Sequence, residues 1–373
     1  MKRKPEGGIY MKKLGFGLMR LPKKGPFTDI EQVKDMVDMF LDAGFTYFDT
    51  AHTYLGSEAA AKKALVSRHP RDSYTLATKL NVNVAPTKKA AEKQLETSLA
   101  RTGAGYFDYY LLHAIMDDNY DKYVKFGLWD FAASQKQKGI LKNIGFSFHS
   151  GPDLLDRILN EHPEVDFVQL QINYADWENP SVLSRANYEV ARKHSKDIIV
   201  MEPVKGGSLA NPQPEVQKLF KECNPDMSCA SWGIRFAASL PGVLTVLSGM
   251  SNTQQMQDNL SYMKDFKPLD KKEQNVIQQV QQILGNSAAI ACTACSYCTA
   301  GCPENIPIPD IFASANKHLS NGQTEEAKKS YAEAVSNRGK ASDCIECKQC
   351  ERVCPQHLKI TEHLKQCAEL LEK

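Results

Sequence analysis

The chain carries the stretch Cys292-Thr-Ala-Cys295-Ser-Tyr-Cys298-Thr-Ala-Gly-Cys302-Pro303 and repeats its spacing in Cys344-Ile-Glu-Cys347-Lys-Gln-Cys350-Glu-Arg-Val-Cys354-Pro355. Both copies read C-x2-C-x2-C-x3-C-P. With this spacing three thiolates close over one face of an iron-sulfur cube, and the fourth cysteine reaches the partner cluster. The two copies therefore predict two [4Fe-4S] clusters. One is assigned to Cys292, Cys295, Cys298 and Cys354, and the other to Cys344, Cys347, Cys350 and Cys302.

All-cysteine zinc sites are the alternative for these runs. Structural zinc normally takes two C-x2-C pairs separated by a longer loop, and three cysteines at successive intervals of three do not fit that arrangement. A disulfide scaffold is not expected either, because only Cys223, Cys229 and Cys367 lie outside the runs. This cysteine usage suits a reducing compartment.

Composition narrows the class of protein further. The 373 residues include 46 Lys and Arg against 44 Asp and Glu, a net charge of +2, and no basic stripe that would indicate nucleic acid as a partner. No apolar run approaches the roughly 18 residues of a membrane span, and the first residues lack the apolar segment of a signal peptide. We expect a cytoplasmic protein.

The region before the cysteine runs alternates short apolar runs with longer segments of helical period, which is typical of repeated βα units. Strands are predicted near 14–21, 46–51, 74–80, 106–114, 141–149, 167–174, 198–204 and 244–250, and the clearest helices at 30–43, 88–101, 123–138 and 181–194. Eight such units favour a closed (β/α)8 TIM barrel. An open Rossmann sheet competes with it, but no G-x-G-x-x-G follows the first strand.

The predicted fold class is thus α/β, a (β/α)8 barrel followed by a small, mostly helical ferredoxin-like iron-sulfur domain. Helices are expected at 253–266, 272–284, 311–319 and 324–335. The predicted domains are an N-terminal tail at 1–10, the barrel at 11–266, a linker helix at 267–285 and the iron-sulfur domain at 286–373.

Polar residues at the carboxyl ends of barrel strands are the candidates for chemistry. They are Asp49, His52, Lys79, His113, Ser147, His149, Gln169, Gln171, Asn173 and Glu202. Each alone has a structural explanation, such as a helix cap or a hydrogen-bonded core histidine. Because parallel strands end at one mouth, we expect the set to converge there.

Several stretches resemble the aldo-keto reductase superfamily. They are 44–58, Ala77-Thr78-Lys79, 109–113, 144–147, 168–174 and 202–207, within a similarity that covers about 11–266. With the cysteine runs, which resemble two-cluster bacterial ferredoxins, the chain is similar to the branch with a C-terminal ferredoxin-like domain. The resemblance implies a catalytic tetrad of Asp49, Tyr54, Lys79 and His113.

Those four residue types suit carbonyl reduction. Hydride addition leaves an alkoxide that needs a proton from a general acid, and a tyrosine can supply it. A free phenol titrates near 10, but a lysine cation held by an aspartate favours the phenolate. A histidine can donate a hydrogen bond to the substrate oxygen. The structural alternative is a buried ion pair that only braces the barrel.

The resemblance also implies nicotinamide-binding residues, with departures from the family pattern. The predicted contacts are Ser147, Gln169, Met201, Val204, Gly206, Gly249, Ser251, Gln255 and Asn259. Phe148 stands where the family has Asn, and Met201 where an aromatic residue is usual. Gln255 stands where many members bind the 2'-phosphate with Arg, and neutral Gln offers no bidentate charged contact. NAD and NADP therefore both stay open.

Electron counting leaves a further alternative, because nicotinamide delivers two electrons together and a cluster passes one at a time. A flavin, FMN or FAD, can do both. If the clusters and the barrel work together, either a flavin takes the place of nicotinamide or the substrate itself accepts single electrons. The sequence predicts an oxidoreductase that interconverts a small-molecule carbonyl and alcohol with NAD(P)(H), coupled to electron transfer through two [4Fe-4S] clusters. A flavin-containing reductase is the alternative, and an external redox partner protein is a further candidate. A non-catalytic redox sensor or scaffold is the other class considered.

Overall fold

The computed structural model describes residues 12–285 and 288–373. The predicted tail at 1–10 lies outside the described residues, as does the start of the predicted iron-sulfur domain at 286. The chain divides into two compact units. The first comprises the described part of Met1–Asn173 with Leu183–Pro203 and Ser231–Leu269, and the second comprises Tyr174–Val182, Val204–Ala230 and the described part of Asp270–Lys373.

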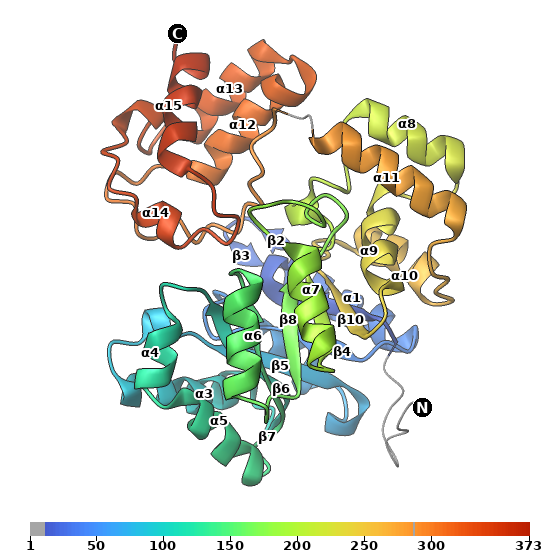
Figure 1. The fold of residues 1–373 in the computed structure, drawn as a ribbon, viewed down its shortest axis with the longest axis vertical. Coiled ribbons are helices and arrows are strands. Elements are labelled where there is room, and N and C mark those ends of the chain that lie inside the picture. Colours follow the sequence, from blue (N-terminus) through green and yellow to red (C-terminus); the bar gives the residue numbers. More distant parts are fainter. Residues whose placement is uncertain (1–11, 286–287) are drawn as a thin grey trace. The chain divides into compact units, whose positions relative to one another are not determined.

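The first unit is a closed barrel of parallel strands, which confirms the predicted architecture (Figure 1). Its strands are β1 (Leu14–Gly17), β4 (Tyr47–Asp49), β5 (Thr75–Leu80), β6 (Phe107–Ile115), β7 (Leu141–Phe148), β8 (Phe167–Gln171), β9 (Asp197–Met201) and β10 (Val243–Ser248). Each pairs with its neighbour in chain order, and β1 closes the ring against both β4 and β10. β8 is buried along its whole length, as expected for a parallel strand covered on both faces. All eight carboxyl ends therefore meet at one mouth.

Helices of the first unit follow the strands around the barrel. They are α1 (Ile30–Asp42), α2 (Ser57–Ala61), α3 (Lys88–Thr102), α4 (Tyr120–Lys125), α5 (Leu128–Gln137), α6 (Pro152–Glu161), α7 (Ser184–Lys193) and α10 (Thr253–Met263). α9 (Cys229–Ser239) begins in the second unit and ends in the first. Asp29 caps α1 by accepting a hydrogen bond from the Gln32 amide, and Thr87 caps α3 in the same way.

The structure differs from the sequence prediction at several boundaries. The predicted helix at 123–138 is two helices, because Gly127 adopts a left-handed φ of 63° between α4 and α5. The strand predicted at 14–21 ends at Gly17, where a 3-10 turn, Leu18–Arg20, begins. A short hairpin of β2 (Lys23–Lys24) and β3 (Phe27–Thr28) was not predicted.

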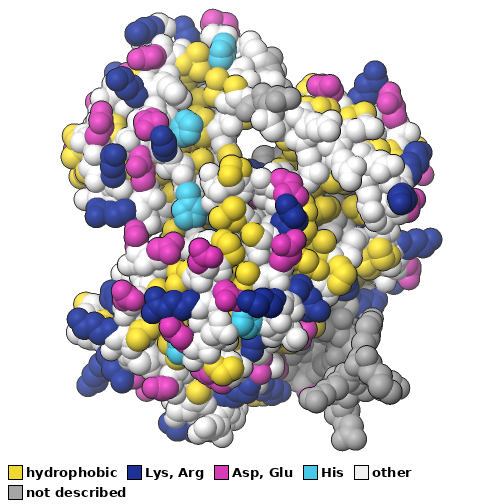
Figure 2. All heavy atoms as spheres, viewed as in Figure 1, with side chains coloured by type: hydrophobic (Ala, Val, Ile, Leu, Met, Phe, Trp, Pro, Cys, Tyr) yellow, Lys and Arg dark blue, Asp and Glu magenta, His cyan; other side chains and the backbone are white. Residues whose placement is uncertain are grey.

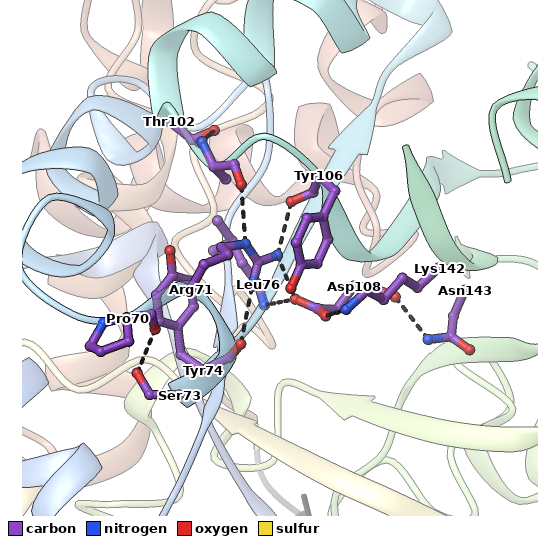
Figure 3. A network of polar contacts seen from close by, with 11 residues as sticks. Pro70, Arg71, Ser73, Tyr74, Leu76, Thr102, Tyr106, Asp108, Lys142 and Asn143 are labelled. Carbon is purple, nitrogen blue, oxygen red and sulfur yellow. Dashed lines mark hydrogen bonds and ion pairs between the residues drawn. The ribbon is translucent and has the colours of Figure 1, made fainter. Parts of the chain in front are cut away.

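A polar network braces the amino-terminal ends of β5, β6 and β7 (Figure 3). Arg71 donates to the backbone oxygens of Ala104, Tyr74 and Tyr106 and lies 2.7 Å from Asp108. Asp108 also accepts from the Leu76 amide at 3.0 Å. These contacts lie at the end of the barrel opposite the mouth, where polar contacts serve stability rather than chemistry.

The second unit is mainly helical. Its helices are α8 (Pro214–Cys223), α11 (Lys271–Gly285), α12 (Ile308–Asn321), α13 (Thr324–Ala334), α14 (Gln349–Arg352) and α15 (Ile360–Leu371). α11, α12 and α13 confirm the helices predicted at 272–284, 311–319 and 324–335, whereas α15 was not predicted. Apolar residues of α12, α13 and α15 share one hydrophobic core with four buried cysteines, Cys298, Cys350, Cys354 and Cys367.

Charges are mixed on the surface. Figure 2 shows one face of the molecule, on which basic and acidic side chains alternate without a large patch of one sign. In the part of the chain that the structure describes, no helix has the length and apolarity needed to cross a membrane.

Candidate functional site

Lys79 and Asp49 form a buried ion pair at the mouth of the barrel. The Lys79 ammonium lies 2.5 Å from a carboxylate oxygen of Asp49 and donates to the backbone oxygen of Thr50 at 2.7 Å. Both side chains are almost fully buried, with exposed fractions of 0% and 4%. Burial lowers the pKa of Lys79, and the Asp49 carboxylate opposes that shift. The pair therefore places one fixed cation under the mouth.

Tyr54 and His113 lie next to this cation. The Lys79 ammonium is 5.0 Å from the centroid of the Tyr54 ring, and the rings of Tyr54 and His113 meet edge to face at 5.7 Å. Burial lowers the pKa of His113 well below its ordinary value, and Lys79 and His149 add to the shift. His113 is therefore neutral near pH 7 and has one N–H to donate. The structure thus brings the four predicted catalytic residues together.

A local irregularity of β6 shapes the position of His113. The pairing of β6 with β7 shifts register between Leu112 and Ile115, and Ala114 adopts a left-handed φ of 55°. The Ala114 amide donates to the Ser147 hydroxyl at 2.7 Å, and the His113 carbonyl accepts from the Tyr123 hydroxyl at 2.5 Å. Such an irregularity re-aims a side chain. Ser147, predicted as a cofactor contact, thereby also holds the backbone beside His113.

Glu58 is a buried carboxylate near the site that the sequence prediction did not include. It accepts from the Thr78 hydroxyl at 2.9 Å and lies 3.3 Å from Arg101. Its charge raises the pKa of Lys79 and so helps to keep the ammonium protonated. The only signal in the sequence was its position four residues after Tyr54, in Gly56-Ser57-Glu58.

Two predicted cofactor residues carry buried polar atoms without a partner. The side-chain oxygens of Gln169 and Asn259 are buried and accept no hydrogen bond, while the Gln169 amide donates to the Met201 sulfur at 3.4 Å. A buried amide oxygen without a partner costs about 1–3 kcal/mol. Such atoms fit a ligand that brings hydrogen-bond donors, and the carboxamide and ribose groups of a nicotinamide cofactor do so.

Other predicted cofactor residues have local roles. The Gln255 side chain accepts from the Ser251 amide at 2.7 Å, and the Gln255 amide donates to Asn252 at 2.8 Å. These bonds close the start of α10, so Gln255 acts as a capping residue where an Arg would bind phosphate. Gly249 is exposed just after β10.

Val204 and Gly206 belong to the second unit, apart from the rest of the predicted cofactor set. Gly206 has a left-handed φ of 67°, and a Cβ at this position would lie 2.4 Å from the backbone oxygen of Thr293. Thr293 follows Cys292. The loop after β9 therefore packs directly on the first cysteine run, and only glycine fits there.

Each predicted cysteine quartet surrounds one cavity of the second unit. Cys292, Cys295, Cys298 and Cys354 line one, and Cys302, Cys344, Cys347 and Cys350 line the other. Each cavity takes three cysteines from one run and one from the other. Apolar side chains such as Phe312 and Leu364 complete the walls, and such a shell tunes a metal site.

Within the described residues, no group of three or more His, Cys, Asp or Glu side chains could hold one metal ion. Burial raises the pKa of Cys350 to about 11, with contributions from Glu351 and Cys344. A positively charged metal core is what would hold such thiols as thiolates. All eleven cysteines are free of disulfides.

Comparison with known proteins agrees with this geometry. The profile of the aldo/keto reductase family matches residues 13–282. The chain belongs to this family. A 4Fe-4S dicluster domain matches residues 291–359, which contain both cysteine quartets. The predicted combination of an aldo-keto reductase barrel with an iron-sulfur domain is thus confirmed.

Curated aldo-keto reductases match parts of the chain. Methylglyoxal reductase DkgA of Yersinia pestis is 28% identical over 44% of this chain and 55% of its own length. Aldo-keto reductase str7 of Strobilurus tenacellus is 29% identical over 54% of this chain and 61% of its own length. The chain therefore spans little more than half the length of these relatives.

A solved structure shares the barrel. The aldo-keto reductase from Klebsiella pneumoniae in complex with NADPH has a TM-score of 0.60 and 19% identity, with coverage of 73% of this chain and 91% of its own. At this identity the likeness concerns the fold alone.

Proposed function

We propose that this aldo-keto reductase is an oxidoreductase that interconverts a carbonyl and an alcohol by hydride transfer, with Tyr54 as general acid and base. The observation that carries the proposal is the buried Lys79–Asp49 pair, whose ammonium lies 5.0 Å from the Tyr54 ring. A scaffold would gain little from this pair, because isolating two charges from water costs several kcal/mol per ion.

Each residue of the tetrad has a distinct role. Lys79 stabilises the phenolate that Tyr54 becomes after it gives its proton to the substrate oxygen. Asp49 and the Thr50 carbonyl hold the ammonium in place. His113, neutral because of burial and Lys79, donates a hydrogen bond that orients the same oxygen.

A nicotinamide cofactor would be held by Gln169 and Asn259, whose side-chain oxygens lack partners, with Ser147 and Met201 beside Gln169. When bound, the cofactor supplies or accepts the hydride. The NADPH complex of the Klebsiella pneumoniae neighbour supports this type of cofactor. The capping role of Gln255 leaves the choice between NAD and NADP open, and no finding supports a flavin.

Deuterium labelling tests the proposal and separates it from a flavin mechanism. The anaerobically purified full chain is incubated with a carbonyl substrate and nicotinamide deuterated at the transferable position of C4. Direct hydride transfer predicts deuterium on the product carbon. A product that carries only solvent hydrogen would contradict it, because electrons passed through a flavin or a cluster lose the label to water.

We also propose that the two quartets hold [4Fe-4S] clusters, with Cys354 completing the first and Cys302 the second. When bound, such clusters would pass electrons one at a time to or from a redox partner. The support is the crossed composition of both cavities and the dicluster match. We expect close to eight iron and eight acid-labile sulfide per chain, and roughly half of each in Cys354→Ala or Cys302→Ala. Stoichiometric zinc without sulfide would contradict the assignment.

We also propose that the clusters exchange electrons with the barrel, and this coupling has its own test. Anaerobic stopped-flow spectroscopy follows cluster absorbance while substrate and cofactor turn over. Bleaching on the timescale of turnover is expected if the electrons are shared with the barrel. Clusters that stay oxidised during normal turnover would contradict this coupling, and the clusters would then be structural or serve an external redox partner.

A further inference from the structure

The second unit contains a cavity that none of the predicted site residues lines. Its volume is about 290 Å³. Gln356 and Leu358 line both this cavity and the one surrounded by Cys292, Cys295, Cys298 and Cys354. A small molecule in the cavity would therefore sit directly beside the first cysteine quartet.

A buried cation forms part of the wall. Lys205 is 8% exposed and pairs with Asp176, which is fully buried. Lys205 has a left-handed φ of 47°, and Gly206 and Gly207 after it are also left-handed. A non-glycine residue keeps such a conformation only where its surroundings enforce it, and these positions concentrate at functional sites. The ion pair and the loop together fix the ammonium at the cavity.

The lining carries two ammonium groups, those of Lys205 and Lys359, against one carboxylate. Lys359, His357 and His363 lie around the cavity, together with the side-chain amides of Asn179 and Gln366. Glu362 is the one carboxylate in the lining and lies 3.5 Å from Lys359. The first residues of α15 also face the cavity, and the partial positive charge of a helix start adds to the same field. This balance favours a ligand rich in acceptor oxygens.

The lining also indicates which anion fits. It contains no arginine, the residue that binds phosphate in a bidentate manner, and no glycine-rich anion nest. Val182 and Leu358 give an apolar stretch that can contact a carbon skeleton. We propose that this cavity binds a small organic carboxylate next to the first cysteine quartet. The site is additional to the tetrad and does not depend on hydride transfer.

Binding of a carboxylate in this cavity should change the electrostatic environment of the first cysteine quartet. If that quartet holds a cluster, as proposed above, a carboxylate beside it disfavours an added electron. The reduction potential of the first cluster should then fall when the site is filled.

Isothermal titration calorimetry on the anaerobically purified full chain tests the site, with succinate as the probe. Uncharged succinamide has the same skeleton, and inorganic phosphate is the alternative anion. We expect succinate to bind at least tenfold more tightly than either. Lys359→Gln should weaken succinate binding about tenfold, about 1.4 kcal/mol. Lys365→Gln, an exposed lysine of the same helix outside the cavity, should leave it unchanged.

Several results would overturn the proposal. They are equal binding of succinate and succinamide, tighter binding of phosphate, absence of binding to all three probes, and equal weakening by both lysine variants. Lys359 is 74% exposed, so its substitution should not unfold the protein. Because calorimetry requires no turnover, failure of this site and failure of the Tyr54 mechanism are separate outcomes.

Discussion

Replacing Lys79 with Met removes the cation at the mouth while keeping a side chain of similar length. The Asp49 carboxylate is only 4% exposed and would lose its ion pair with Lys79. Its other oxygen already accepts no hydrogen bond. Breaking a buried pair from one side costs about 3–5 kcal/mol. At pH 7 we therefore expect amides of β4 and β5 to exchange with solvent on the order of 10² to 10³ times faster, if they exchange through global opening.

The sign of the pH dependence makes this prediction specific. Burial already raises the pKa of Asp49, and loss of Lys79 removes the charge that opposes the shift. A carboxyl group whose pKa is higher in the folded than in the unfolded chain stabilises the fold at pH values below the unfolded pKa, near 3.9. This contribution is lost as the pH rises through the folded pKa. The penalty of Lys79→Met relative to the unchanged protein should therefore shrink between pH 7 and pH 5.

Hydrogen exchange followed by mass spectrometry measures this in the intact chain, without unfolding the iron-sulfur unit. The matched control is Asp49→Asn combined with Lys79→Met, which removes both charges and should recover about 2 kcal/mol or more of the loss. Exchange in Lys79→Met equal to that of the unchanged protein at pH 7 would refute the reasoning. So would a double variant as unstable as the single one.

Three further perturbations test other parts of the structure. Asp108→Ala removes the acceptor of Arg71 and of the Leu76 amide, so the free energy of unfolding from thermal denaturation should fall by about 2–4 kcal/mol. The control is Glu92→Ala, which removes the surface ion pair with Lys88 and should cost under about 1 kcal/mol. Equal effects of the two substitutions would contradict the bracing role of Asp108. The pKa of His113 is held well below its ordinary value in the folded chain. Below about pH 6.5 the unfolded chain therefore binds a proton at His113 that the folded chain does not bind, and the free energy of unfolding should fall as the pH drops below that value. His113→Gln should make this fall shallower in pH-dependent denaturation, and an unchanged slope in His113→Gln would count against a neutral His113. Gly206→Ala should lower the iron content and the melting temperature of the second unit, because the new Cβ meets the Thr293 backbone. The control is Gly322→Ala, which has a similar φ of 69° but open space around it, so it reports the backbone strain without the contact. Identical effects of the two substitutions would exclude the contact as the cause.

The sequence was sufficient for the parts that depend on local pattern. Runs such as 74–80 and 141–149 became strands of the barrel because β-branched and apolar residues fill a doubly covered parallel sheet. The cysteine spacing predicted both quartets, including the exchange of Cys302 and Cys354, because two intervals of three residues bring three thiols of a run to one cluster and the fourth cysteine, four residues further on, reaches the other. Whether those thiols bind iron stays a prediction.

Features that depend on packing between distant segments could not be predicted. The left-handed Ala114 is fixed by a bond to Ser147 from the next strand, and nothing in the sequence around Ala114 signals it. Glu58 counts as a site residue only because Thr78 and Arg101 enclose it. Gly206 was predicted as a cofactor contact from its motif, whereas its closest constraint is the backbone of Thr293, far along the chain.

Turnover of Tyr54→Phe tests the proposed mechanism most directly. The substitution keeps the ring that meets His113 and Lys79 and removes the one proton that the mechanism transfers. With a carbonyl substrate and nicotinamide, kcat should fall by a factor on the order of 100 or more, while the Kd of the cofactor stays unchanged. Tyr188→Phe, whose hydroxyl donates to Pro241, is the matched control and should keep full activity. Full activity of Tyr54→Phe would contradict the proposal that Tyr54 is the proton donor.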